Sequence, residues 1–275
     1  MLSSTDLLIG LPDYLEEARV QSLPSSVYYI ADFITKDEEI AILEKVVSVP
    51  ELEQRLRTML THYTQIATAP KPRWRVLNHR RLQTWPSVLA NNTLFESALP
   101  SWLVDPIISR LLSIPTVANS ENSNIFSDSP HKAPNHVLIN EYLPGQGIMP
   151  HKDGSAYHPA VCTVSLGGSL CLDTYGSNED GGTERRPRWK ILQEPRSLLI
   201  TTGEMYTDYL HGIADITADT ELNSETVENW ALLRSPEQVV NGTNERQIRT
   251  SLTYRDVLKV SKLGSKLGLF GRCLN

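Results

Sequence analysis

The chain has 275 residues, a formal net charge of −6, and 40% apolar against 21% charged residues. This length suffices for one large domain or two small ones, and the composition excludes a chain that is disordered throughout. The negative net charge argues against a surface that binds polyanions everywhere, so any contact with nucleic acid would need a local basic patch.

The N-terminal part of the chain is predicted to be helical over residues 1–70. Apolar spacing indicates a helix around Leu11–Val20, and a second is expected over 51–62. Between them, Thr35 and Glu38 have the spacing of a capping box. The helix that follows it should turn three apolar side chains to one side, namely Ile40, Leu43 and Val47.

Residues 71–81, KPRWRVLNHRR, carry five positive charges and no acid, with Trp74 inside the stretch and Trp85 close behind. Basic side chains interleaved with aromatic ones suit single-stranded nucleic acid, through phosphate contacts and base stacking. The alternative is a solvated basic surface. The stretch 99–114 is then predicted to form one further amphipathic helix.

From residue 135 onward the pattern changes to short segments rich in β-branched and aromatic residues, separated by Gly or Pro turns. These segments are HVLINEY, AVCTVSL, SLCLDTY, SLLITT and RTSLTYRDV. Helices first and strands later predict a mainly β protein with flanking helices (α+β), and the even strand spacing fits a jelly roll over 135–257. We expect residues 1–275 to form a single domain.

Two segments interrupt the strand pattern. Residues 176–187 have the composition of a loop, and residues 213–248 carry seven acids against two arginines. The second is expected to be a mobile or partly helical insertion, pinned by Trp230 and Leu232. The last stretch, 258–275, is basic, and a solvated surface explains it better than a contact with nucleic acid.

His151 and Asp153 stand one residue apart, so in an extended chain their side chains point to the same side. Two imidazoles and one carboxylate on one face form an Fe(II) site with open positions. His211 is the best candidate for the second imidazole, because it follows a strand that looks buried and a turn at Gly203. On spacing alone this triad is a modest signal, since H-x-D pairs arise often by chance.

Two further strands add polar side chains to the same interior. In HVLINEY, Leu138, Asn140 and Tyr142 share a face, and a buried Asn and Tyr need hydrogen-bond partners. In RTSLTYRDV, one face carries Arg249, Ser251, Thr253 and Arg255. Arginines inside a sheet need an anion, so with a metal triad they favour a dicarboxylate ligand. Two exposed arginines on a solvated face are the alternative.

The motifs NEYLPG, HKDG, LHG and RTSLTYR together resemble the AlkB family of Fe(II)- and 2-oxoglutarate-dependent dioxygenases, and its eukaryotic members in particular. The resemblance spans about Trp74 to Val257. It implies a double-stranded β-helix, the jelly-roll form of this superfamily. It also implies Fe(II), 2-oxoglutarate and O2 as cofactor and co-substrates.

By the same resemblance, His151, Asp153 and His211 are the metal ligands. The positions that match contacts to 2-oxoglutarate are Asn140, Tyr142, Arg249, Ser251 and Arg255. Arg249 would bind the distal carboxylate. Residues 71–90 would form a substrate lid, with Arg80, Arg81 and Gln83 at the pocket mouth or on the nucleic-acid backbone.

The chain departs from the family's bacterial founder at two points. An acidic residue that helps to read the damaged base in the founder is Ser155 here, and the span of 38 residues from His211 to Arg249 is longer. Both leave the substrate open. The expected reaction is oxidative demethylation or hydroxylation of RNA or DNA. The alternatives are a protein side chain as substrate, or a nucleic-acid-binding protein with little turnover; a zinc hydrolase is disfavoured by the paired arginines.

The N-terminus lacks a basic stretch followed by a long apolar run, and no window reaches the length of a membrane span. Three cysteines are too few and too scattered for a disulfide framework. We therefore expect a monomer without a membrane partner, in the cytoplasm, the nucleus or both.

Overall fold

The computed structural model describes residues 10–24, 26–46, 74–118, 120, 123–177 and 182–262. Several predictions fall wholly or partly outside these residues: parts of the helical region 1–70 with Val47 and the helix over 51–62, the start of the lid at 71–73, part of the loop 176–187, and the basic tail from residue 263.

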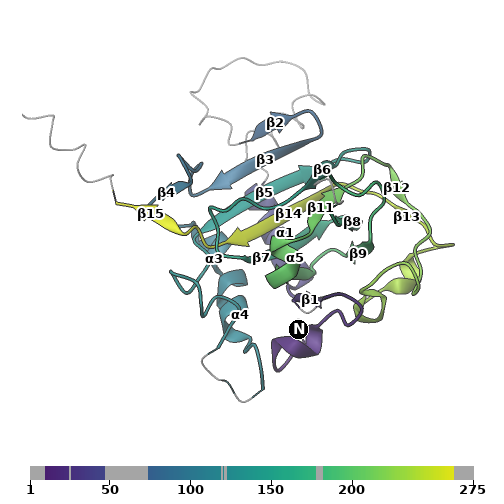
Figure 1. Cartoon of the computed structure of the whole chain (residues 1–275), viewed down its shortest axis with the longest axis horizontal. Coiled ribbons are helices and arrows are strands. Elements are labelled where there is room, and N and C mark those ends of the chain that lie inside the picture. The colour runs from purple at the N-terminus through teal and green to yellow at the C-terminus, as the bar shows by residue number, and fades with distance from the viewer. Residues whose placement is uncertain are drawn as a thin grey trace, which may run out of the picture.

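Two antiparallel sheets form the body of the molecule (Figure 1). The larger sheet has the strand order β1-β10-β7-β14-β5-β3-β2, and the smaller has the order β6-β11-β8-β9. The strands of the larger sheet are β1 (Val27–Ile30), β2 (Arg75–Leu77), β3 (Arg80–Trp85), β5 (His136–Tyr142), β7 (Ala160–Gly167), β10 (Leu198–Thr202) and β14 (Arg249–Arg255). Those of the smaller are β6 (Ile148–His151), β8 (Leu170–Tyr175), β9 (Trp189–Gln193) and β11 (Leu210–Ile213).

This arrangement confirms the predicted class, a mainly β chain built as a jelly roll. The five strand segments predicted from composition correspond to β5, β7, β8, β10 and β14. The same pattern explains why each of them forms a strand. Each has apolar residues at alternate positions or in a continuous run, and these can be buried on the faces of the two sheets. A short parallel pair, β4 (Thr93–Phe95) and β15 (Lys259–Ser261), lies beside the larger sheet.

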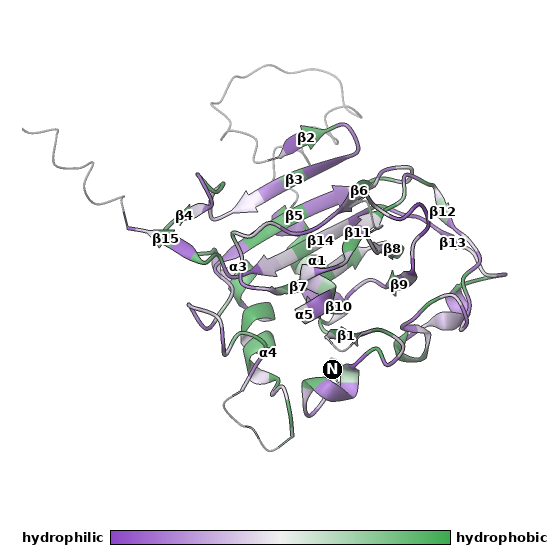
Figure 2. Cartoon of the chain, viewed as in Figure 1, coloured by the Kyte–Doolittle hydropathy of each residue, from purple (hydrophilic) through white to green (hydrophobic). Residues whose placement is uncertain are grey.

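The main hydrophobic core lies between the outer face of the larger sheet and the helices α1 (Lys36–Val46), α3 (Ser101–Val104) and α4 (Ile107–Ser113). Figure 2 shows α4 as a largely hydrophobic element on this side. The single helix predicted over 99–114 is wrong, because the chain forms two helices there. Pro106 separates them, since proline lacks the N–H of a helix interior and disfavours helical backbone in the residue before it.

The N-terminal segment contains less helix than predicted. Around Leu11–Val20 the structure has only the 3-10 helix η1 (Leu15–Ala18). The capping box at the start of α1 is confirmed: Glu38 N donates to Thr35 Oγ1 at 3.1 Å, and Thr35 N donates to Glu38 Oε2 at 2.8 Å.

The buried face of α1 agrees with the predicted one at Leu43, which packs against the main core, and differs at Ile40, while Val47 lies outside the described residues. Ile42 and Val46 are buried together with Glu39, whereas Ile40 is 47% exposed. The helix is rotated because Glu39 is drawn inward, accepting a hydrogen bond from Gly167 N at 2.8 Å and pairing with Arg196 at 3.2 Å.

The acidic segment 213–248 is ordered rather than mobile. It contains β12 (Ala218–Asp219), η2 (Trp230–Leu232), η3 (Pro236–Gln238) and β13 (Asn244–Glu245). Its apolar residues Leu222, Val227 and Leu233 are buried in a second core cluster with β8, β9 and β10, and Trp230 and Leu232 pack against that cluster as predicted. Of the helices in the described ranges, none is long and apolar enough to cross a membrane.

Candidate active site

The two predicted imidazoles meet on neighbouring strands of the smaller sheet. His151 at the end of β6 lies directly opposite His211 in β11, and the ring centroids are 4.4 Å apart. Asp153 follows β6 by two residues, and one candidate ligand atom from each of the three side chains lies within 4.8 Å of the others. Within the described ranges this is the only group of His, Cys, Asp or Glu close enough to hold a metal ion.

The protonation of both imidazoles suits metal binding. His151 Nδ1 lies 2.9 Å from the carbonyl oxygen of Met149, so this nitrogen must carry the proton and donate, leaving Nε2 free as a ligand. Burial lowers the pKa of His211 to about 4, against the opposing effect of Asp153, so this ring is neutral at physiological pH.

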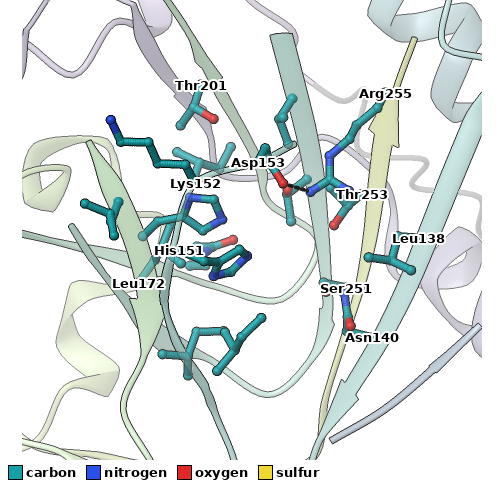
Figure 3. A pocket seen from close by; sticks show the side chains of 18 of the residues that line it. Leu138, Asn140, His151, Lys152, Asp153, Leu172, Thr201, Ser251, Thr253 and Arg255 are labelled. Carbon is teal, nitrogen blue, oxygen red and sulfur yellow. Dashed lines mark hydrogen bonds and ion pairs between the residues drawn. The ribbon is translucent and has the colours of Figure 1, made fainter. Parts of the chain in front are cut away.

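The carboxylate is held by an arginine from the other sheet. Arg255 Nη2 donates to Asp153 Oδ1, and both side chains are less than a tenth exposed (Figure 3). The same guanidinium lies 5.0 Å from the ring centroid of Tyr157. Asp153 is therefore fixed in position by β14, although its backbone belongs to the loop after β6.

The triad opens into a cavity of about 290 Å³ between the two sheets. All five residues predicted to contact 2-oxoglutarate line it from the larger sheet: Asn140, Tyr142, Arg249, Ser251 and Arg255. They are brought together because β5 and β14 are neighbours, with Ser251 opposite Asn140 and Arg249 opposite Tyr142. Figure 3 shows Asn140 and Ser251 facing His151 across this space.

Arg249 tests whether these residues fit an anionic co-substrate. Its side chain is buried, yet its hydrogen bonds go to neutral groups, with Nη2 donating to Ser165 Oγ and to Gln193 Oε1, both at 2.9 Å. Its Nε is buried without a partner among the described residues. Burial lowers the pKa of Arg249 to about 10. A buried cation with an unused donor is costly unless an anion joins it, so the cavity fits the carboxylate of 2-oxoglutarate.

The three residues predicted at the lid separate onto two faces of β3. Arg80 lines the cavity, and its Nε donates to Asn140 Oδ1 at 3.2 Å. Arg81 and Gln83 do not line it, so of the two predicted places, the pocket mouth or the nucleic-acid backbone, the pocket mouth is wrong for these two residues. Arg81 pairs with Glu141 at 2.7 Å, and Gln83 is buried and donates to the carbonyl oxygen of Val46. The two-residue period of a strand decides this, because Arg80 lies on the face of Asn140 and its neighbour on the other.

Ser155 is exposed and does not line the cavity, whereas Gly154 does. The prediction missed several residues that do, among them Lys152, Tyr157, Thr163, Gln193 and Thr201. A signal was present in β7 and β10, where Thr163 and Thr201 interrupt apolar strands on the interior face. Lys152 and Tyr157 lie in the irregular segment around Asp153, where no period assigns a side chain to a face.

Comparisons with known proteins agree with this geometry. Residues 26–255 match the 2OG-Fe(II) oxygenase superfamily. The probable RNA/DNA demethylase ALKBH6 of Danio rerio is 34% identical over 260 residues, covering 92% of this chain and 95% of that protein. The tRNA (carboxymethyluridine(34)-5-O)-methyltransferase ALKBH8 of Macaca fascicularis is 26% identical over 244 residues, covering 88% of this chain and 32% of that longer protein.

Among solved structures, OsALKBH1 matches with a TM-score of 0.44 and 16% sequence identity, over 85% of this chain and 98% of that one. The assignment follows from the sequence matches and from the motifs that the fold assembles around one cavity. The chain belongs to the 2OG-Fe(II) oxygenase superfamily and, within it, to the AlkB family, and it is an Fe(II)- and 2-oxoglutarate-dependent dioxygenase.

Proposed function

We propose that this dioxygenase oxidises an alkylated base in single-stranded nucleic acid, RNA or DNA. The observation that carries the proposal is Arg80. The β2–β3 hairpin (residues 75–85) brings this cation into the wall of the cavity that holds the triad, where its Nε donates a hydrogen bond to the neutral amide of Asn140. A cation at the mouth suits a phosphate, and the ALKBH6 relative is named as a probable RNA/DNA demethylase.

His151, Asp153 and His211 would hold the iron. Two neutral imidazoles and one carboxylate on one side of a metal leave the other side open for co-substrates. The hydrogen bond from His151 to Met149 and the contact between Arg255 and Asp153 orient two of the three ligands.

Arg249 would bind the distal carboxylate of 2-oxoglutarate, with Asn140, Tyr142 and Ser251 around the rest of the molecule. Burial raises the pKa of Tyr142, so its hydroxyl keeps its proton and acts as a donor. Arg255 acts mainly on Asp153, and so serves the metal as well as the edge of the co-substrate site.

Bound iron supplies the oxidising chemistry, in which 2-oxoglutarate and O2 give succinate and carbon dioxide and one substrate C–H is hydroxylated. The protein positions the reactants and excludes water. If the hydroxylated carbon is an N-methyl, the product loses formaldehyde and the net reaction is demethylation.

The test is succinate and formaldehyde release by iron-loaded protein on a panel of methylated single-stranded RNA, single-stranded DNA and peptides. We expect both products to rise with a nucleic acid. Stimulation by peptides alone would favour a protein substrate. Tight binding of nucleic acid with no rise in either product would favour a binding protein.

A further inference from the structure

The charges around the cavity are strongly unequal. Four cationic side chains line it, namely Arg80, Lys152, Arg249 and Arg255, and among the described residues Asp153 is its only carboxylate. Asp153 is already paired with Arg255. Four cations against one carboxylate leave three positive charges, and Fe(II) with doubly charged 2-oxoglutarate would leave that excess unchanged.

The carboxylates of the flanking strands point away from the cavity. In β5, Asn140 and Tyr142 line it, so Glu141 between them lies on the other face, where it pairs with Arg81. In β8, Leu172 and Thr174 line it, and Asp173 lies on the other face. The alternation of a strand therefore excludes both carboxylates from the site.

Among the described residues, the rim adds no acid to the wall. Asp215 pairs with His79 at the tip of the β2–β3 hairpin, at 3.0 Å. Glu204 and Asp208, at the two ends of α5 (Gly203–Thr207), are exposed and do not line the cavity. The position that follows Asp153 by two residues is the neutral Ser155.

From this distribution we infer that the enzyme selects electrically neutral alkylated bases and rejects those that carry a fixed positive charge. The inference rests on the proposed function and names the substrate class of the same site. A cationic base would enter a wall with excess positive charge and no free carboxylate to offset it, and like charges a few ångströms apart repel strongly where water is excluded.

Matched pairs of methylated bases test the effect of charge. N6-methyladenine is neutral, whereas 1-methyladenine, which differs in the position of its methyl group, binds one more proton at neutral pH and is cationic. Likewise 3-methyluracil is neutral, whereas 3-methylcytosine is cationic at neutral pH and similar in shape. Each is placed once in the same single-stranded RNA and DNA sequence, so the phosphate contacts cancel in the comparison. Turnover is measured with Fe(II), and binding with Mn(II) in its place.

We expect the neutral member of each pair to have a kcat/KM at least about tenfold higher, and to bind more tightly to the Mn(II) protein, where tenfold corresponds to about 1.4 kcal/mol. Lys152→Gln and Lys152→Glu lower the charge of the wall in two steps. The side chain is exposed and donates to the carbonyl oxygen of Thr207. The preference for the neutral base of each pair should fall at each step, because the wall then repels the cationic base less. Any effect of the substitution on iron binding is common to both bases and cancels in the comparison.

If the cationic bases are turned over as fast as the neutral ones or faster, the inference is overturned and the proposed function still stands. The same holds if the preference is present but does not respond to the charge at position 152. If no methylated oligonucleotide raises succinate or formaldehyde, the proposed function itself fails, and the inference with it.

Discussion

At the scale of single residues, the site depends on side chains whose partners come from distant strands. Asp153 is the clearest case, because it is the only carboxylate of the cavity among the described residues and Arg255 holds it from the opposite sheet. Its removal would take away the carboxylate proposed as an iron ligand and would leave that arginine buried without its anion.

We predict that Asp153→Ala abolishes succinate formation, because it removes the only anionic ligand of the iron. Metal binding should weaken in parallel, measured as Mn(II) affinity by electron paramagnetic resonance. Asp208→Ala is the control, since that carboxylate is exposed and does not line the cavity. Anomalous scattering that places the metal away from His151, Asp153 and His211 would sink the assignment.

Arg249 carries a second prediction. Arg249→Ala should weaken 2-oxoglutarate binding by about 2–5 kcal/mol, the usual loss when one partner of a buried charge pair is removed. Calorimetry on the Mn(II)-loaded protein measures this. Arg249→Lys keeps the charge without the guanidinium fork and should recover only part of the affinity. Arg255→Ala should cost less 2-oxoglutarate affinity and more metal affinity. Unchanged 2-oxoglutarate affinity in Arg249→Ala would refute the assignment.

At the scale of elements, the β2–β3 hairpin matters because it extends the larger sheet beyond β5 to the cavity mouth. The two neighbouring arginines of β3 point to opposite faces of the sheet. Arg80 lies in the cavity wall, whereas Arg81 pairs with Glu141 and its guanidinium carbon lies 4.2 Å from the ring centroid of Trp74. This gives a matched pair of variants on one strand.

Arg80→Gln should weaken binding of single-stranded RNA or DNA. It should also reduce the magnitude of the slope of log affinity against log salt concentration by about one, because the loss of one phosphate contact means that fewer counterions are released on binding. Arg81→Gln should leave that slope unchanged and lower thermal stability instead. Gel-shift titrations at several salt concentrations decide the matter. A slope that changes with Arg81 but not with Arg80 would assign the phosphate contact to the other face of the hairpin.

At the scale of the whole molecule, the acidic segment 213–248 is closed by a buried ion pair between two of its own residues and packs onto the jelly roll through its apolar side chains. Arg246 pairs with Asp219 at 2.6 Å, both side chains are almost fully buried, and Arg246 also donates to the carbonyl oxygen of Ala214. The segment thus packs as part of the fold, on the side of the smaller sheet where Leu222, Val227 and Leu233 are buried.

Asp219→Ala should lower the free energy of unfolding by about 3–5 kcal/mol, because it leaves Arg246 buried and uncompensated. Urea denaturation measures it. Glu16→Ala, which breaks the partly exposed pair with Arg19, should cost about 1 kcal/mol or less. An equal loss in both variants would mean that the buried pair does not hold the segment in place.

The sequence by itself determined the class of fold, the strand segments of the core and the residues that meet at the cavity. This was possible because strand composition, the two-residue period and the H-x-D spacing are local properties that survive folding. The resemblance to the AlkB family supported His211, which strand context had already favoured, and added the roles of Asn140 and Arg249, which no local pattern assigns.

Only the tertiary structure decided which face of β3 points into the cavity, how α1 is rotated, and whether the acidic segment is packed. Each depends on a partner far along the chain: Asn140 for Arg80, Gly167 for Glu39, and Arg246 for Asp219. The charge excess of the cavity belongs to the same group. It arises because strand pairing turns Arg80, Arg249 and Arg255 toward the cavity and Glu141 and Asp173 away from it. The net charge of the wall therefore cannot be predicted from any one segment of the sequence.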